Sequence, residues 1–394
     1  MKLNLIQALR ALAAYLVLIY HIRAIELGEI TKAGTSESPL VGGPFVNGWI
    51  GVDLFFVISG FIMVYVTASK PWGISTARDF LVSRAVRIYP PWWLFMGLMG
   101  LYLFLAHGVP WDAEAVTRQE NTPFVHVINS IFLLPQNSFP ILAVGWTLVH
   151  EVWFYVVFAI LLLAPRQTLP ILLFVWALGV FFGALAGLSA PYVFNFTHLA
   201  FAPVTLEFIA GGFVAMLYLK GVRIFPLIML LVGVISYLAV GWLHGNATMF
   251  TLEWGRVLYC TLPCAILVYG AACMEGRVQG PALTWMGRLG DWSFSLYLSH
   301  ILVIGGVKVI NPVIANHAEP LLGLPAGTLN FLRLGTPGIL DNIVYVSVSV
   351  VAATLVSAIA FYLFERPVTG FLNRKFKPRP PKPDNVGLIE TGSP

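Results

Sequence analysis

The chain alternates between long apolar runs and short polar connections. Ten runs are long enough to cross a bilayer, because a membrane-spanning helix needs about 20 mostly apolar residues. They are 4–23, 46–68, 90–107, 143–164, 168–188, 203–219, 224–243, 256–274, 291–311 and 342–364. The run 124–134 is too short to span and is typical of a re-entrant or interfacial segment. The pattern therefore predicts an all-α, polytopic integral membrane protein with about ten transmembrane helices.

The composition agrees with this prediction and excludes several other classes of protein. Hydrophobic residues make up 58% of the 394 residues and charged residues only 10%, whereas a soluble domain carries about 25% charged residues. The formal charge of +5 comes from basic residues scattered among short loops, so nucleic acid is not an expected partner. The three cysteines lie in one apolar run. They provide neither a disulfide framework nor zinc-binding spacing, and no metal is expected.

The distribution of basic residues predicts the orientation in the membrane. Loops on the cytoplasmic side carry an excess of Lys and Arg. If the N-terminus is cytoplasmic, 16 basic residues fall inside and 6 outside, with Arg10 left within the first run. We therefore expect both termini in the cytoplasm, with a transmembrane domain over 1–370. Residues 371–394 would form a basic, Pro-rich cytoplasmic tail that is partly disordered.

The first run carries an arginine near its start and a histidine near its end. Arg10 and His21 are eleven residues apart, which places them within about 20° of the same helix face and about 16 Å apart along the axis. Ionisable groups cost about 2.5–3.5 kcal/mol each in the hydrocarbon and usually face the protein interior. One helix face is therefore predicted to present a cation at one depth and an imidazole at another.

Other polar side chains are expected inside later runs, at depths similar to one another. They are Asp53 in the second run, His150 and Glu151 in the fourth, Glu207 in the sixth, and Tyr297, Ser299 and His300 in the ninth. A set of buried histidines and carboxylates suggests proton-handling chemistry or a proton relay.

Two short stretches add candidate binding residues. The loop predicted before the third run contains Arg84 and Arg87, which are i,i+3 neighbours on one helix face. Paired arginines suit bidentate binding of phosphate, although anchoring to the inner leaflet explains them equally well. Ser59 and Gly60 lie near the middle of the second run, where a glycine lets another helix approach closely.

Taken together, these stretches resemble the membrane-bound acyltransferase family 3. The matching residues are Arg10 and His21; Phe55, Phe56, Ser59, Gly60 and Phe61; Arg84, Arg87 and Ile88-Tyr89-Pro90; Trp146, Leu148 and Glu151; Tyr297, Leu298 and His300; and Phe364-Glu365-Arg366-Pro367. The likeness covers residues 5–367, and six motifs in order make it specific. Thr147 stands where the family often has serine, and it keeps the hydroxyl group.

The resemblance implies an acyl-CoA-dependent O-acyltransferase of the bacterial cytoplasmic membrane. Such an enzyme moves an acyl group, usually acetyl, to a hydroxyl of an extracytoplasmic or lipid-linked glycan such as an exopolysaccharide. It also implies that Arg84 and Arg87, with Tyr89, bind acetyl-CoA at the inner face. The small pair Ser59 and Gly60 would leave room for the pantetheine arm.

The same resemblance assigns expected catalytic roles. His21 would act as general base on the acceptor hydroxyl or as a transient acyl carrier, and Arg10 would stabilise negative charge near the thioester. Glu151 would orient or charge-balance His21. Asp53 and His300 are second-rank catalytic candidates.

Two further functions are compatible with the buried ionisable residues. The first is a proton-coupled transporter of a glycan or small acid, with His21, Asp53, Glu151 and His300 as its relay. The second is a non-catalytic scaffold for glycan assembly in the lipid bilayer. The sequence leaves the acceptor, the acyl group and the oligomeric state open.

Overall fold

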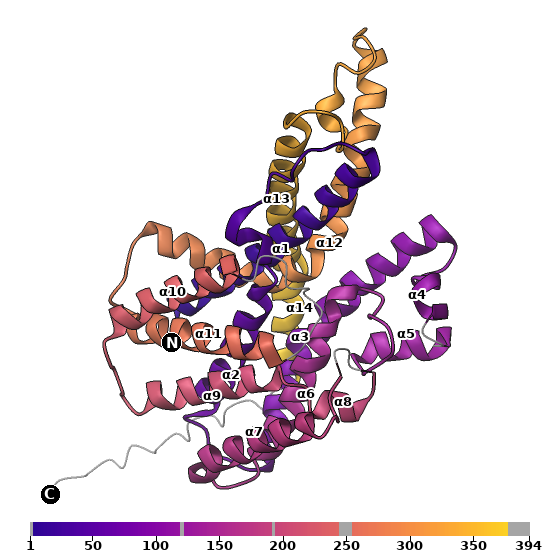
Figure 1. Ribbon diagram of the computed structural model, residues 1–394. Helices are drawn as coiled ribbons and strands as arrows, with labels where there is room; N and C mark the ends of the chain where they lie inside the picture. The colour runs from indigo at the N-terminus through magenta and orange to yellow at the C-terminus, as the bar shows by residue number, and fades with distance from the viewer. Residues whose placement is uncertain (1–2, 119–121, 191–193, 244–253, 377–394) are drawn as a thin grey trace, which may run out of the picture.

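The computed structural model describes residues 3–118, 122–190, 194–243 and 254–376 (Figure 1). Within these ranges the regular secondary structure is entirely helical, and ten helices are long and apolar enough to cross a membrane. The fold class predicted from the sequence is thereby confirmed. The helices that form these ten segments are α1 (Asn4–Ala33), α2 (Ile50–Thr67), α3 (Ile74–His107), α6 (Trp146–Leu161), α7 (Leu169–Leu185), α9 (Thr205–Leu219), α10 (Pro226–Leu243), α11 (Trp254–Met274), α12 (Pro281–Leu321) and α13 (Leu340–Ala360).

Shorter helices complete the fold. They are α4 (Ala113–Arg118), α5 (Pro123–Phe132), which forms from the short apolar run, and α8 (Phe196–Ala200). A π-helical turn, Phe361–Glu365, joins α13 to α14 (Arg366–Phe376). The first six residues of the predicted tail therefore belong to a helix that continues from the last membrane helix. Residues 377–394 of the predicted tail lie outside the described residues.

Helix α3 corrects one prediction. Its 34 residues form one helix from Ile74, so Arg84 and Arg87 lie inside a helix and not in a loop before it. The helix continues through Pro90 and Pro91 although proline has no amide hydrogen to donate. Tertiary packing overrides this local preference, because the next side chain, Trp92, is completely buried and its Nε1 donates to the carbonyl of Ser130 at 2.9 Å.

The centre of the molecule is a tight crossing of α2 and α9. A Cβ on Gly60 would lie 1.8 Å from the carbonyl oxygen of Phe208, and one on Gly211 would lie 1.9 Å from that of Val57. The two backbones are therefore in direct contact, as small residues allow in membrane helices. The predicted close approach at Gly60 is confirmed, and its partner is α9.

We expect Gly60→Ala to destabilise the protein by about 1–3 kcal/mol, the usual cost of an overpacked core. The added methyl group would have to displace the backbone of α9. Thermal unfolding of the detergent-solubilised protein measures this effect. Gly97→Ala on α3 is the matched control, because nothing lies within 4 Å of its Cβ position. Equal melting temperatures for both variants would contradict the packing described here.

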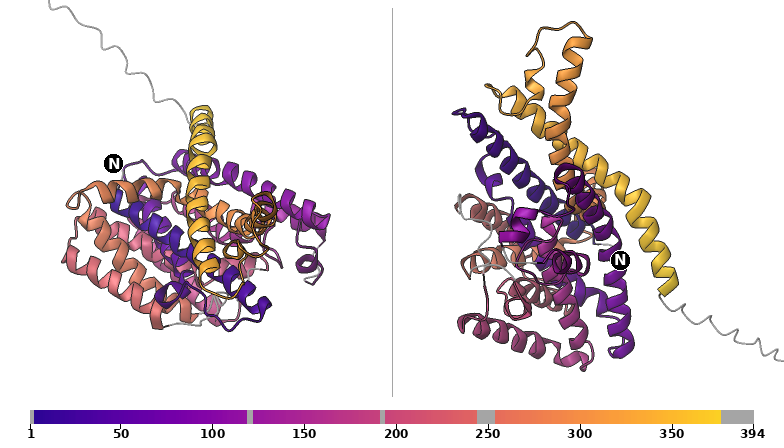
Figure 2. Two further views of the ribbon diagram at one scale, coloured as in Figure 1. Left: turned by 90° about the horizontal axis from the view of Figure 1, so that it is seen from above. Right: turned by 90° about the vertical axis from the view of Figure 1, so that its right-hand side faces the viewer.

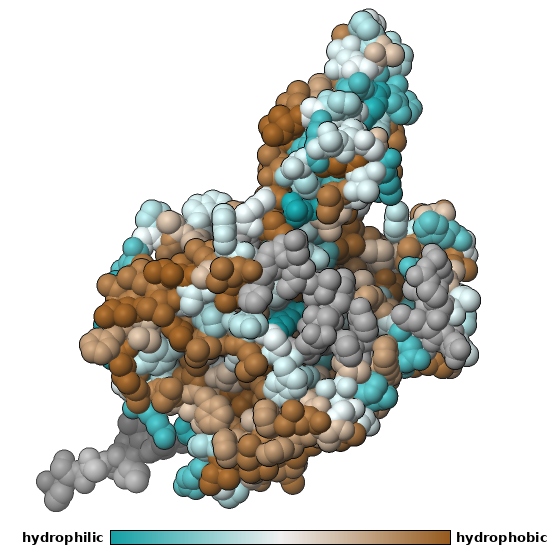
Figure 3. Space-filling view, in the orientation of Figure 1, coloured by the Kyte–Doolittle hydropathy of each residue, from teal (hydrophilic) through white to brown (hydrophobic). Residues whose placement is uncertain are grey.

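Helix α12 is longer than a bilayer requires. Its 41 residues extend about 60 Å, twice the hydrocarbon thickness of about 30 Å. Its C-terminal end projects from the helical body beside the ends of α1 and α13 (Figures 1 and 2). Hydrophobic residues cover much of the body, whereas hydrophilic residues gather at the tip of this projection (Figure 3). The projecting end therefore presents hydrophilic side chains together with exposed leucines such as Leu321 and Leu322.

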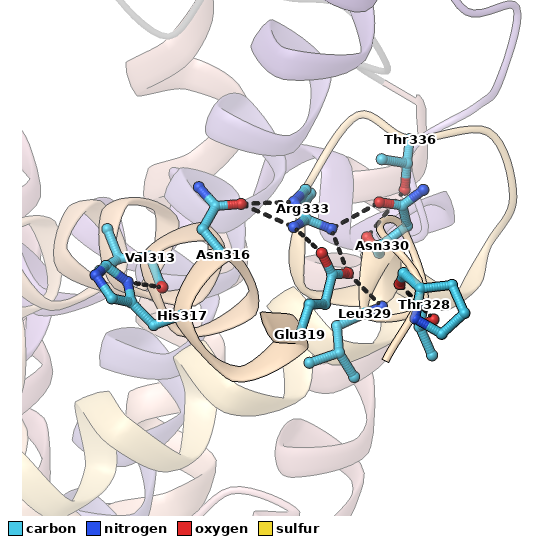
Figure 4. Close-up of polar contacts among 10 residues, drawn as sticks. Val313, Asn316, His317, Glu319, Thr328, Leu329, Asn330, Arg333 and Thr336 are labelled. Atoms are coloured by element: carbon cyan, nitrogen blue, oxygen red, sulfur yellow. Dashed lines mark hydrogen bonds and ion pairs between the residues drawn. The ribbon is translucent and has the colours of Figure 1, made fainter. Parts of the chain in front are cut away.

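One arginine fastens the loop after α12 to that helix (Figure 4). Arg333 Nη2 donates to Glu319 Oε2 at 2.9 Å and to Asn316 Oδ1 at 2.7 Å, and its Nη1 donates to Asn330 Oδ1 at 2.7 Å. Glu319 also accepts from the amide of Leu329 at 2.8 Å. These contacts hold the loop against the projecting end of α12.

A long-range contact caps the first helix. The amides of Asn4 and Leu5 donate to the two carboxylate oxygens of Glu275, at 2.8 and 2.9 Å. Helix N-termini have unpaired amides and favour negative charge. Glu275 follows the last residue of α11, so the start of α1 and the end of α11 lie at the same face of the molecule.

Candidate active site

A cavity of about 70 Å³ lies between α1, α2, α3, α6 and α12. Apolar side chains form most of its wall. Its polar lining residues are Arg10, Ser59, Arg84, Arg87, Thr147, Glu151, Tyr155, Ser293 and Tyr297. Five residues that the sequence nominated separately, Arg10, Ser59, Arg84, Arg87 and Glu151, are thus brought to one place.

The charged residues of the cavity are mostly cationic. Three guanidinium groups, from Arg10, Arg84 and Arg87, face one carboxylate, that of Glu151. Arg10 is only 8% exposed and donates to Gln7 Oε1 at 2.8 Å. Like charges are costly to place together inside a protein, and guanidinium groups are well suited to phosphate and carboxylate. The cavity therefore favours an anionic group.

Glu151 is held by two hydroxyl groups. Its Oε1 accepts hydrogen bonds from Ser59 Oγ at 3.0 Å and from the hydroxyl of Tyr155. The sequence predicted His21 as the partner of Glu151, and the structure gives it these hydroxyl partners instead. Tyr155 was not predicted as a site residue, although its position four residues after Glu151 places both on one face of α6. The guanidinium of Arg84 lies 5.9 Å from the Tyr155 ring centre.

The two predicted histidines form a pair beyond Tyr297. The Tyr297 ring lines the cavity, and its centre lies 5.8 Å from that of His300. His300 Nε2 lies 3.3 Å from His21 Nδ1, and the two ring centres are 4.9 Å apart. His300 is 1% exposed, whereas His21 is only partly buried. Neither histidine is a lining residue of the cavity, and Tyr297 is the lining residue that contacts the pair, through His300.

The position of Tyr297 is fixed through Thr147. The two hydroxyl oxygens are 2.8 Å apart, and each lies 3.0 Å from the carbonyl oxygen of Val144. A serine at this position would provide the same hydroxyl oxygen. Threonine in place of serine at position 147 therefore keeps the hydroxyl contact with Tyr297.

Asp53 belongs to a different cluster. Its two oxygens accept from Arg256 Nε and Nη2, both at 2.8 Å. Asp53 is completely buried, Arg256 is 8% exposed, and its guanidinium also lies 4.8 Å from a Trp49 ring centre. The nomination of Asp53 as a catalytic residue is therefore not supported by its position, because the side chain joins α2 to α11. Arg256, the first residue of the predicted run 256–274, is its buried partner.

Two predicted CoA-binding residues also face away from the cavity. Gly60 packs on the backbone of Phe208 in α9. The hydroxyl of Tyr89 donates to the carbonyl of Phe132 at 3.1 Å, at the end of α5. Neither lines the cavity. Neighbouring positions on a helix point in different directions, so Ser59 faces the cavity while Gly60 cannot.

Metal ligands are not grouped in the part of the chain that the structure describes. There, no set of three or more His, Cys, Asp or Glu side chains could hold a metal ion.

Comparison with known proteins identifies the family. The family model of the acyltransferase 3 domain matches residues 3–362. The chain is 33% identical to the exopolysaccharide production protein ExoZ of Rhizobium meliloti (strain 1021), over 83% of this chain and 91% of that protein. It is 25% identical to the acyltransferase MdmB of Streptomyces mycarofaciens, over 77% and 79% of the two chains. No solved structure matches the chain. Ten helices among the described residues are long and apolar enough to cross a membrane, and the chain is a multi-pass membrane protein of the acyltransferase 3 family.

Proposed function

We propose that this protein transfers an acyl group, most simply acetyl, from cytoplasmic acyl-CoA to a hydroxyl of an extracytoplasmic or lipid-linked glycan. Its location would be the bacterial cytoplasmic membrane. The observation that carries the proposal is a small cavity lined by three arginines and by Tyr297, whose ring contacts one of two paired histidines. The relative named for exopolysaccharide production supports a glycan acceptor.

The arrangement suggests how the donor is bound. Arg84 and Arg87 would hold phosphate groups of CoA, because guanidinium groups form paired hydrogen bonds with phosphate. Arg10 would stabilise the negative charge that develops on the thioester carbonyl oxygen. Ser59 and the apolar wall of the cavity would accommodate the pantetheine arm.

The reaction needs one base. His21 would accept the proton of the acceptor hydroxyl while the hydroxyl oxygen attacks the thioester carbon. The C–O bond forms, the C–S bond breaks, and the proton passes to the CoA sulfur, so that the products are an ester and free CoA. An acyl group carried briefly on the same imidazole nitrogen is the alternative route to the same products. In both routes, the thioester would have to reach His21 past the wall of the cavity, because His21 does not line it.

The transporter hypothesis is less well supported by the geometry. A proton relay through His21, Asp53, Glu151 and His300 needs these groups to form a connected series. In the structure, Asp53 pairs with Arg256, Glu151 binds hydroxyl groups, and the two histidines contact each other. These are three separate clusters.

Labelled acetyl-CoA tests the proposal. Purified protein in lipid nanodiscs, supplied with a glycan fraction from the source membrane, should move the acetyl label to glycan and release one CoA for each ester formed. Heat-denatured protein is the control. Proton-linked flux of a glycan in vesicles, with no label transferred and no CoA bound, would overturn the proposal in favour of the transporter.

The arginine pair gives a direct test of donor binding. Arg84→Gln and Arg87→Gln should each weaken CoA binding by about 1.5–3 kcal/mol, the value of a hydrogen bond to a charged group, or about 10- to 150-fold. Arg78→Gln on the same helix is the matched control, because Arg78 is exposed and does not line the cavity. Calorimetric titration with CoA measures the affinities. Unchanged affinity in both cavity variants would place the CoA phosphates elsewhere.

A further inference from the structure

We propose that His300 is a positioning residue that holds His21 with its ring hydrogen on Nδ1, which leaves Nε2 of His21 as the reacting nitrogen. This inference rests on the proposed function, because it specifies which atom of His21 acts and what keeps that atom available. The observations that carry it are the hydrogen-bond partners of the two imidazole rings.

The first observation concerns His21 itself. Its Nδ1 lies 2.9 Å from the carbonyl oxygen of Val17, one turn earlier in α1. A carbonyl oxygen can only accept, so Nδ1 must carry the hydrogen. In a neutral imidazole the other nitrogen, Nε2, then has a free lone pair. This lone pair is what a general base or a nucleophile needs.

The second observation concerns His300. Its Nδ1 lies 3.2 Å from the carbonyl oxygen of Leu296, so the same reasoning places a hydrogen on that nitrogen. Its Nε2 is then an acceptor, and it lies 3.3 Å from His21 Nδ1. The hydrogen on His21 Nδ1 is therefore shared between the carbonyl of Val17 and Nε2 of His300. Both acceptors favour the same tautomer of His21.

The surroundings make His300 suitable for a fixed orienting role. It is 1% exposed in α12, so its ring cannot turn freely, and Tyr297 lies at its side. When His21 takes up a proton on Nε2, its Nδ1–H keeps both acceptors. His300 therefore orients the ring before proton transfer and stabilises it afterwards, without touching the substrate. In histidines generally, the hydrogen bond made by one ring nitrogen decides which nitrogen carries the hydrogen.

Three variants of the purified protein in nanodiscs test the inference. His300→Ala removes one of the two acceptors of the His21 Nδ1 hydrogen and should lower kcat about 10-fold with an unchanged KM for acetyl-CoA, because the protonated ring that forms in the reaction loses this contact. His300→Gln keeps an oxygen acceptor and should recover most of the lost rate. Ser299→Ala is the matched control, because Ser299 is equally buried on the same turn of α12. It should behave like the unmodified protein.

A spectroscopic measurement separates orientation from a structural effect. Nitrogen-15 spectra of protein labelled at histidine should show His21 with a protonated Nδ1 and an unprotonated Nε2. In His300→Ala the signal should move toward a mixture of tautomers, whereas His300→Gln should resemble the unmodified protein. His21→Ala assigns the His21 signals.

The outcomes distinguish this inference from the proposed function. If the unmodified protein transfers no acetyl group, the proposed function fails, while the tautomer measurement still tests the histidine pair. If transfer is normal but His21 carries its hydrogen on Nε2, the inference fails. It also fails if His300→Ala leaves kcat and the tautomer signal unchanged.

Discussion

Replacement of His21 by alanine should lower acyl transfer by about 10²- to 10⁴-fold, the usual contribution of a positioned general base. The loss follows from chemistry rather than from donor binding. His21 does not line the cavity that contains Arg84 and Arg87. The affinity for CoA should therefore stay within about 2-fold of that of the unmodified protein, which is a change in binding free energy of less than RT.

The measurement is transfer of labelled acetyl to glycan, with protein amount determined in the same samples. His317→Ala is the matched control, since His317 lies at the exposed end of α12, where its Nδ1 donates to the carbonyl of Val313 at 2.8 Å (Figure 4). It should have normal activity. Normal transfer by His21→Ala would remove His21 from the mechanism, and with it the proposed reaction.

Breaking the ion pair between Asp53 and Arg256 should have the largest effect on stability. Removing one partner of a buried ion pair usually costs about 3–5 kcal/mol, because a charge is left without compensation. Arg256→Gln should show this loss in full, whereas Asp53→Asn should show part of it, because Arg256 keeps its interaction with the buried Glu207. The double variant should recover much of it, since two neutral amides can bind each other at the same place.

Thermal unfolding in detergent, followed by tryptophan fluorescence, measures these differences. Lys32→Ala is the control for a surface pair, because Lys32 contacts Glu29 at 2.9 Å with its side chain 72% exposed. Such pairs contribute about 0–1 kcal/mol. If Asp53→Asn unfolds at the same temperature as Lys32→Ala, the pair is not a stabilising contact. If the double variant is no better than either single one, the charges are not coupled.

The sequence predicted the fold well because the hydrocarbon core imposes a simple length requirement. Apolar runs of about 20 residues can only be helices in a bilayer, and all ten predicted runs correspond to helices long enough to cross a membrane. The lengths were harder to predict. Pro90 and Pro91 read as the start of a helix, but they lie inside α3. The helix continues through these prolines because neighbouring side chains such as Trp92 make tertiary contacts, and these contacts depend on the fold.

Only part of the candidate site could be predicted. Depth along a helix follows from its 1.5 Å rise, so the sequence could place Arg10 and His21 at different depths and Ser59 near the middle of its run. The hydrogen-bond partners of these side chains could not be predicted, because the contacts join helices that are far apart in the chain. Ser59 and Glu151 are separated by 92 positions, and Asp53 and Arg256 by 203. These pairings depend on the direction in which each side chain projects from its helix axis. A helix that is apolar on all sides has little periodicity from which that direction could be predicted.

The cap on the first helix has a consequence for biosynthesis. Asn4 and Leu5 are synthesised long before their carboxylate partner, Glu275, which is 271 and 270 positions later. Domains generally fold from the N-terminus as the ribosome elongates the chain. Helix α1 would therefore enter the bilayer before the carboxylate that caps it exists, and these two amides would gain their partner only after α11 has been synthesised.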